Sequence, residues 1–385
     1  MAAGTSASSD GVDGWAAREG GPRHDAQPPP APATRIDSLH TRNFPDLLHQ
    51  LGGSLLVATG GSGRLIVLYA DGAAVGTHAF GVPCIAGIAA DGARVAVAAS
   101  PLIVEFHNLP DVARHLHDPP RHDAVYLARR SHVTGAVGIR DMAWDGRGEL
   151  WLASTLLSSL CTLDAQSALV PRWRPHFVGR CVSEDRCHLN GIAVRDGHPR
   201  YVTALGATDT AQGWRATRHA GGVLVDCGDE CILAHGLSLP HSPRWHDGRL
   251  WLLEAGRGAL VTVDPQTGRK TDVAHVPGYA RGLGFLGPVA FVGVSRPREG
   301  GAVADTTRRD RGGVWAVHID SGRTLALLEF SGDATEVHAV QALPGVRFPG
   351  LVHGGDLLSF SYALPPQALR DVDPALFGTP EATTR

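Results

Sequence analysis

The chain has 385 residues, of which 43% are hydrophobic and 19% are charged, with 48 glycines and a formal net charge of −3. This composition provides enough apolar material for a large core with many turns, in one large domain or in two. The small net charge argues against nucleic acid or an anionic membrane as an electrostatic partner, and Lys270, the only lysine, argues against a catalytic-lysine mechanism.

The sequence also indicates a compartment. It contains no stretch long and apolar enough to span a membrane, and its first residues lack the apolar core of a signal peptide. Six cysteines are too sparse for a disulfide scaffold: Cys84, Cys161, Cys181, Cys187, Cys227 and Cys231. We therefore expect a cytoplasmic protein with reduced thiols.

Both ends of the chain have the composition of tails. Residues 1–35 are rich in Ala, Gly, Ser and Pro, including "AQPPPAPA", and such a segment buries too little surface to stay ordered. Residues 363–385 form a Pro-rich C-terminal tail. A single domain is predicted over residues 40–362, in which helical periodicity is nearly absent apart from "FPDLLHQLG" near residue 44.

Between the tails the sequence repeats one unit. An apolar strand, a polar turn with glycine and a second apolar strand recur as "GIAADGARVAVAAS", "DMAWDGRGELWLAS", "GIAVRDGHPRYVTA", "SPRWHDGRLWLLEA" and "GLGFLGPVAFVGVS". Third strands such as "LCTLDAQS" and "LVTVDPQTG" follow, and the units begin near residues 86, 140, 190, 241 and 281. Short antiparallel strands at this period are typical of β-propeller blades. The predicted fold class is therefore all-β, a β-propeller.

The number of blades depends on the two ends of the domain. "SLLVAT", "RLIVLYADG" and "AVGTHAF" (54–80) are three strands with no inner strand before them, whereas "EVHAVQALPG" (336–345) is an inner strand with no full blade after it. Pairing them gives six blades, closed by strands from both termini, and removes exposed sheet edges. Seven blades is the alternative, because residues 346–362 could add strands.

The inner strands of a propeller all start at the same mouth of the central channel, and each second strand returns to that mouth. Glu254, at the end of a second strand, is therefore expected beside His241. Alignment of the six inner strands places these residues at the rim: Ala86, Arg140, Asn190, His241, Arg281 and Glu336.

The chemistry of this rim suits two kinds of ligand. One is a divalent cation, for which two carboxylates, an imidazole and an amide form a plausible ligand set. These groups belong to Glu336, Glu254, His241 and Asn190. The guanidiniums of Arg140 and Arg281 would bind an anionic substrate bidentately. The polar lining could equally be incidental, because propeller channels are often wet.

Loops around the mouth extend the candidate site. Insertions at 206–222 and 296–313 follow second strands and would emerge on the ligand face. Segment 129–141 also leads into the rim. These segments and the rim strands provide further candidates for substrate binding: His132, Asp141, Ser242 and Arg296. His188, just ahead of Asn190, is a candidate acid or base near pH 7, and a structural histidine is the alternative.

Other motifs in the sequence give weaker indications of function. Cys181, Cys187 and His188 lack a fourth ligand at a familiar zinc spacing, and "CGDEC" (227–231) falls where a β-turn should follow an outer strand. The sequence has no Gly-x-Ser-x-Gly nucleophile elbow. These patterns do not predict a cysteine-based metal site or a serine hydrolase.

The motifs "CHLNGIAV", "PHSPRWHDGRLW", "ARGLGF", "VGVSRPRE" and "VQALPGVRFPG" are similar to those of an uncharacterised bacterial propeller family, a conserved domain of unknown function. This resemblance covers nearly all of residues 40–360. It implies a fold and no established activity.

The chain also resembles, more weakly, the senescence marker protein 30/gluconolactonase family of six-bladed metal-dependent hydrolases. Glu336 falls at that family's Glu position, and Asn190 matches its Asn-Gly motif. His241 stands where a second Asn is expected, and Glu254 where an Asp is expected. The resemblance implies a metal at these four residues, and the Asn-to-His change puts calcium in doubt and favours zinc or manganese.

Two classes of function follow. In the first, the protein is a hydrolase or lyase acting on a small anionic compound, with a metal that polarises a substrate oxygen or activates water and with His188 or Glu254 moving a proton. In the second, the propeller is a non-catalytic binding or interaction module, for which a protein is a possible partner, and the polarity of the channel is incidental.

Overall fold

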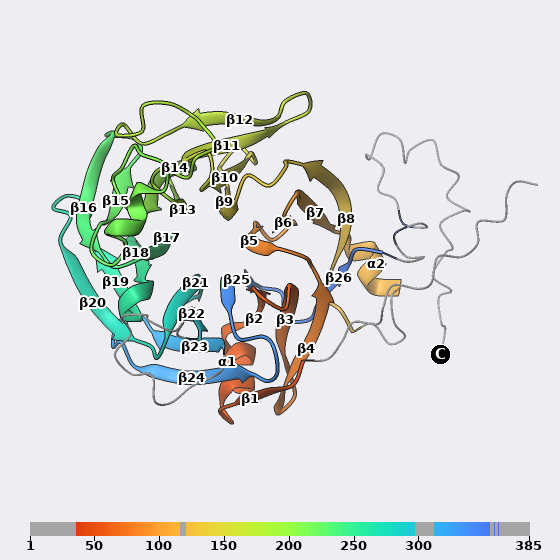
Figure 1. Cartoon of the computed structure of the whole chain (residues 1–385). Helices are drawn as coiled ribbons and strands as arrows, with labels where there is room; N and C mark the ends of the chain where they lie inside the picture. Colours follow the sequence, from red (N-terminus) through yellow and green to blue (C-terminus); the bar gives the residue numbers. More distant parts are fainter. Residues whose placement is uncertain (1–35, 116–120, 297–311, 355–357, 359–360, 362–385) are drawn as a thin grey trace, which may run out of the picture.

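The computed structural model describes residues 36–115, 121–296, 312–354, 358 and 361. The predicted tails, 1–35 and 363–385, lie outside these residues, as does most of the predicted insertion 296–313. Figure 1 shows the described part of the chain as a ring of sheets around a central axis.

Five of the sheets contain four antiparallel strands that are consecutive in sequence. The first of the four lies next to the axis and the fourth lies farthest from it. The five sets of strands are β5 to β8 (Ile85–Ala90, Arg94–Ala99, Leu102–Asn108, Ala124–Val133), β9 to β12 (Ile139–Trp144, Leu150–Ser154, Ser159–Asp164, Ala168–Trp173), β13 to β16 (Leu189–Arg195, His198–Ala204, Gly222–Asp226, Cys231–Leu237), β17 to β20 (Pro240–His246, Arg249–Glu254, Ala259–Val263, Lys270–His275) and β21 to β24 (Tyr279–Leu286, Val289–Ser295, Gly313–His318, Thr324–Phe330).

The sixth sheet closes the ring. β2 (Gly53–Thr59), β3 (Arg64–Asp71) and β4 (Ala74–Gly81) take their inner strand from the far end of the domain, β25 (Val337–Pro344). The pairing is antiparallel and runs from Gly53 opposite Pro344 to Thr59 opposite Val337. The prediction of six blades closed by strands from both termini is therefore confirmed.

The remaining strands extend existing blades at their outer edges. β26 (Pro349–Val352) pairs in parallel with β8, so it adds no seventh blade among the described residues. β1 (Ser38–His40) pairs with β24. In this way both ends of the domain cover outer strands that would otherwise be exposed edges.

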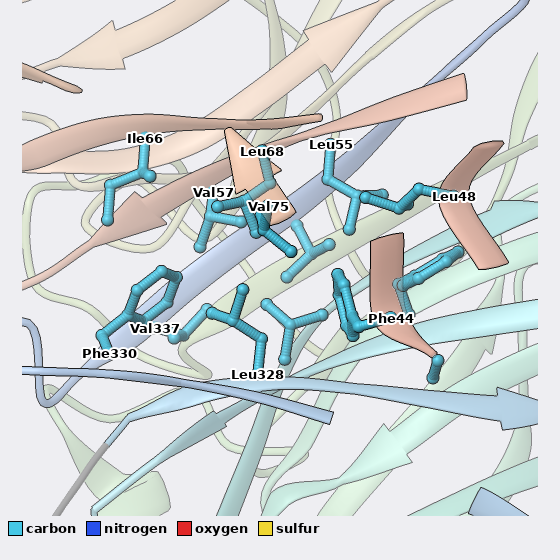
Figure 2. Close-up of a cluster of buried hydrophobic side chains, with 14 of the residues drawn as sticks. Phe44, Leu48, Leu55, Val57, Ile66, Leu68, Val75, Leu328, Phe330 and Val337 are labelled. Carbon is cyan, nitrogen blue, oxygen red and sulfur yellow. The ribbon is translucent and has the colours of Figure 1, made fainter. Parts of the chain in front are cut away.

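The predicted helix is present as α1 (Phe44–Leu51), with Pro45 in its first turn and Gly52 in the left-handed conformation at its end. Phe44 and Leu48 are fully buried. Figure 2 shows them packed among side chains of β2, β3 and β24, such as Leu55, Leu68 and Leu328. The helix thus fills the space between the first and last blades of the sequence. α2 (Pro110–His115) and the 3-10 turns η1 (Gly213–Ala216) and η2 (Ala255–Arg257) are short, and none of the described helices is long and apolar enough to cross a membrane.

The β17–β18 hairpin illustrates how the sequence directs a blade. Asp247 and Gly248 both have positive φ (49° and 70°), as a two-residue type I′ turn requires. Trp251 on β18 is fully buried. Its indole nitrogen donates a hydrogen bond to the carbonyl of His246 (3.1 Å), so the ring fixes the hairpin as well as filling the space between blades.

We predict that Trp251→Ala lowers the free energy of unfolding by about 3–5 kcal/mol, the usual cost of removing a buried aromatic side chain. Urea denaturation followed by circular dichroism measures this loss. Val133→Ala, at an exposed position, should stay within about 0.5 kcal/mol of the parent. Equal stabilities for the two variants would contradict the assigned core.

Candidate functional site

The six residues predicted at the rim all line one cavity of about 440 Å³ at the mouth where the inner strands begin. We call it the rim cavity. The insertion 206–222 contributes Trp214, Arg215, Arg218 and His219 to its lining, so this insertion does lie over the mouth. Arg296, at the start of the second insertion, lines the cavity as well.

The lining of the rim cavity is strongly basic. Among the described residues around it there are five arginines (Arg140, Arg215, Arg218, Arg281 and Arg296) and four histidines (His188, His219, His241 and His338). Glu336 is the single carboxylate in this described lining. Such a concentration of one sign of charge attracts anions into the cavity.

His188 is the histidine with the clearest partner. Its Nδ1 lies 3.0 and 3.2 Å from the two carboxylate oxygens of Asp185. Its ring packs against the Trp214 indole, with ring centroids 4.3 Å apart. Burial lowers the pKa of His188, an effect that the Asp185 carboxylate partly offsets and that Arg140 and Arg281 reinforce.

His241 and His338 also have lowered pKa values. Burial is the main cause for both, and the guanidinium of Arg281 adds to it. The pKa of His241 lies well below the usual 6.5. These imidazoles are therefore neutral at pH 7, although they line an anion-attracting cavity.

His338 has more acceptors than a neutral ring can serve. Its Nδ1 lies 3.1 Å from the carbonyl oxygen of Ile85, and its Nε2 lies 3.4 Å from the Glu336 carboxylate. Both oxygens only accept, whereas a neutral imidazole carries one N–H. A proton taken up by His338 would therefore satisfy both contacts.

Asn190 and Ser242 line the rim cavity, but their polar atoms also hold the inner strands together. The Asn190 amide donates to the Pro240 carbonyl (3.0 Å) and accepts from the Thr203 hydroxyl (2.8 Å). The Ser242 hydroxyl accepts from the Gly282 amide (3.1 Å). Both side chains connect neighbouring blades at the mouth.

The structure does not bring Glu254 to the rim cavity. Its side chain is fully buried and accepts hydrogen bonds from the Ser238 amide (2.8 Å), Lys270 (2.7 Å) and Arg257. Strand pairing sets Pro240, not His241, opposite Glu254. The expectation that His241 and Glu254 lie side by side at the mouth is corrected accordingly, because the Glu254 carboxylate is held by Ser238, Lys270 and Arg257 instead.

Asp141 lies deeper in the channel than its neighbour Arg140. Its buried carboxylate makes a bidentate ion pair with Arg244 (2.7 and 3.0 Å) and accepts from the Ile192 amide (3.1 Å). Arg244 also donates to the Ile192 carbonyl (3.2 Å). Asp141 therefore connects the inner strands of three blades and does not line the rim cavity.

His132 is likewise placed away from the mouth. It lies on the outer strand β8, and its Nε2 is 2.8 Å from the buried carboxylate of Glu105. His107 lies on the other side of the same carboxylate, at 3.8 Å. His132 thus belongs to a polar cluster between outer strands.

The residues present do not assemble the metal ligand set that the sequence predicted. Glu254 is turned away with cationic partners, and the amide oxygen of Asn190 already accepts a hydrogen bond. Across the described residues, no group of three or more His, Cys, Asp and Glu side chains is arranged to hold a metal ion. Metal binding by the rim cavity stays a prediction.

The sequence did not single out several residues that line the rim cavity. His338 could have been found, because it lies on β25 and follows Glu336 by two positions, a spacing that puts both side chains on one face of an extended chain. Trp214, Arg215, Arg218 and His219 lie in the insertion that was expected over the mouth, and only their individual roles were missed. Asp185 gave no signal beyond its spacing of three residues from His188.

A second cavity, of about 550 Å³, lies where the inner strands end. Its lining includes Trp144, Trp245, Phe285 and Arg244. Arginines cover two of these rings: Arg94 lies 3.8 Å from the Trp144 centroid and Arg195 lies 4.1 Å from that of Trp245. The two mouths therefore differ in character, one basic and the other lined with aromatic rings already stacked against cations.

A family profile described as a domain of unknown function (DUF4915) matches residues 42–352. A comparison with curated proteins gives no significant match. Among solved structures, a chain of a nidogen/laminin complex is similar over 76% of this chain and 99% of its own length, with 14% identity and a TM-score of 0.51. That likeness supports the propeller fold alone.

Two further solved structures are similar at lower TM-scores. A protein of unknown function from Bacteroides caccae has 11% identity and a TM-score of 0.45 over 76% of this chain and 98% of its own. TolB from Acinetobacter baumannii has 13% identity and a TM-score of 0.45 over 76% of this chain and 66% of its own.

The three lowered histidine pKa values predict how stability depends on pH. Below pH 6.5 the unfolded chain protonates these imidazoles while the folded protein does not, so the free energy of unfolding falls as the pH drops. The free energy of unfolding should change with pH by at most about 1.4 kcal/mol per pH unit for each imidazole. Urea denaturation between pH 7.5 and 5.5 measures it.

His241→Gln should give a shallower dependence over the same range, because one of the three imidazoles is gone. His275→Gln, at a side chain that is 58% exposed, should leave the slope unchanged. If His241→Gln and the parent lose stability at the same rate, the pKa of His241 is not lowered in the folded protein.

Proposed function

The chain belongs to the DUF4915 family of domains of unknown function, and we propose that its propeller binds a small anionic compound, a carboxylate or a phosphate ester, in the rim cavity. The observation that carries this proposal is the charge of the lining, where five arginines surround one carboxylate. Entry of an anion into a cavity of this composition is favourable, because the anion offsets the repulsion between the positive charges.

The arginines approach the cavity from separate parts of the chain. Arg140 is on β9, Arg281 on β21 and Arg296 directly after β22. Arg215 and Arg218 come from the insertion above them. Planar guanidiniums bind carboxylate and phosphate oxygens in pairs, so an anion on the channel axis could be contacted from several blades at once.

The size and position of the rim cavity support a small molecule rather than a protein surface as the ligand. Its volume of about 440 Å³ lies within the usual range of small-molecule sites. Leu205, Leu239 and Tyr279 form apolar parts of its lining. Apolar groups beside the arginines strengthen the attraction of these arginines for an anion, because they lower the local dielectric constant.

Anion binding is common to both classes of function that the sequence left open. A hydrolase or lyase would first have to hold its anionic substrate here, and a binding module would do nothing else. The metal-dependent form of the enzyme hypothesis depends on Glu254 and Asn190, whose polar atoms have other partners. We therefore propose the anion site without a metal.

We predict that sulfate, inorganic phosphate and small dicarboxylates bind to the parent protein in isothermal titration calorimetry. Arg281→Gln should weaken binding about 10- to 100-fold, the value of a hydrogen bond to a charged group. Arg249→Gln is the matched control, because Arg249 pairs with Asp247 and Asp320 and does not line the rim cavity. Absence of binding by all these anions, or equal losses in both variants, would contradict the site.

We further predict that sulfate binds more tightly at pH 6 than at pH 8. A bound anion raises the pKa values of His188, His241 and His338, so binding takes up protons and is favoured as the pH falls. Sulfate keeps its charge over this range. Calorimetry in buffers of different ionisation enthalpy counts the protons, and a count of zero at pH 6.5 would mean that these imidazoles do not face the anion.

A further inference from the structure

The contact between Asp185 and His188 identifies which nitrogen of His188 is reactive. Both carboxylate oxygens of Asp185 lie within 3.2 Å of Nδ1, and an ionised carboxylate only accepts hydrogen bonds. Nδ1 must therefore carry the proton. In the neutral ring the lone pair is then on Nε2.

The position of the two residues directs Nε2 toward the rim cavity. His188 lines the cavity, whereas Asp185 is not among its lining residues. Nδ1 therefore faces away from the space that a ligand would occupy. Within the part of the chain that the structure describes, Nε2 of His188 makes no hydrogen bond, so it is the nitrogen available to a bound molecule.

The backbone holds this pair rigidly. Asp185 and His188 both have positive φ (47° and 53°), a conformation that costs free energy for residues other than glycine and that surrounding contacts must maintain. The Asp185 amide donates to the Leu156 carbonyl (3.0 Å), and the Asp185 carbonyl accepts from the Gln212 amide (3.1 Å). The turn is thus fixed between the neighbouring blade and the insertion over the mouth.

The ring itself is held from one side. Trp214 packs against the His188 ring, and η1, which carries Trp214, is part of the insertion 206–222. Arg186, between Asp185 and His188 in sequence, anchors that insertion through an ion pair with Asp209 (2.7 Å). Strain, an orienting carboxylate and a packed ring together are typical of a functional histidine.

We propose that Asp185 and His188 form an acid–base pair in which Nε2 of His188 removes a proton from the compound bound in the rim cavity. This inference rests on the proposed anion site. The proton moves to Nε2, and the bonding electron pair stays on the atom that lost the proton. The negative charge that develops there faces Arg140 and Arg281, and the proton returns from the imidazolium in a later step.

The two residues have separate roles. His188 is the catalytic residue, because its Nε2 would touch the reacting atom. Asp185 is a positioning residue that fixes the tautomer and stabilises the imidazolium, as an aspartate does beside a general-base histidine in other enzymes. The neutral state of His188 at pH 7 suits this role, since only the neutral imidazole accepts a proton.

Diethyl pyrocarbonate, which acylates neutral imidazole nitrogens, tests the pair without knowledge of the substrate. Peptide mass spectrometry should find His188 acylated at Nε2 faster than the exposed His275, and sulfate should protect His188 but not His275. At a pH where the ring is neutral in both proteins, the rate at His188 should fall on the order of tenfold in Asp185→Asn, because no carboxylate then holds the proton on Nδ1. The pH of half-maximal reactivity should also move down, because the carboxylate that raises the pKa of His188 is gone.

Glu184→Gln is the matched control, because Glu184 is the adjacent carboxylate and pairs with Arg186 (2.9 Å) instead of with an imidazole. It should leave the reactivity of His188 and its pH profile unchanged. An unreactive His188 in a protein that binds sulfate by calorimetry would overturn the acid–base pair alone. A reactive His188 in a protein that binds no anion would overturn the proposed anion site, and an unchanged pH profile in Asp185→Asn would overturn the role of Asp185.

Discussion

Closure of the ring by β25 against β2 is the pairing on which the rest of the molecule depends. It joins residues from opposite ends of the domain in an antiparallel register of seven pairs, and it gives β2, β3 and β4 their inner strand. Because the ring is closed, the starts of all six inner strands are held around one axis. The convergence of Arg140, Arg281 and Glu336 on the rim cavity is a consequence of that closure, since these residues share no local sequence.

Arginines have different surroundings within the channel and at its mouth. Arg244 is neutralised by Asp141 in a bidentate pair that joins three inner strands, so its charge contributes to the scaffold. At the mouth the arginines outnumber the carboxylates. Burial and the charges of Arg140 and Arg281 lower the pKa values of the neighbouring imidazoles there.

Much of this could be predicted from the sequence because a propeller repeats a simple pattern. Strand alternation and the repeat period were sufficient to identify the inner strands, the six-blade closure and the rim residues from Ala86 to Glu336. The same pattern could not place side chains whose orientation depends on distant partners. Glu254 turns toward Lys270, Asp141 toward Arg244 and His132 toward Glu105, and none of these partners is visible from the period alone. The contact between Asp185 and His188 depends on a turn with positive φ at both residues, which a sequence does not display.

Closure by the end of the domain also sets an order of events during synthesis. The edge of β2 leaves the ribosome early, yet its partner β25 is translated only after the other five blades. At translation rates of about 5–20 residues per second, this interval is on the order of tens of seconds. During that time an apolar strand with unsatisfied backbone groups is available to other chains. A nascent chain of this protein is therefore a candidate for chaperone binding at β2 to β4, and truncation before β25 would leave a permanently open ring.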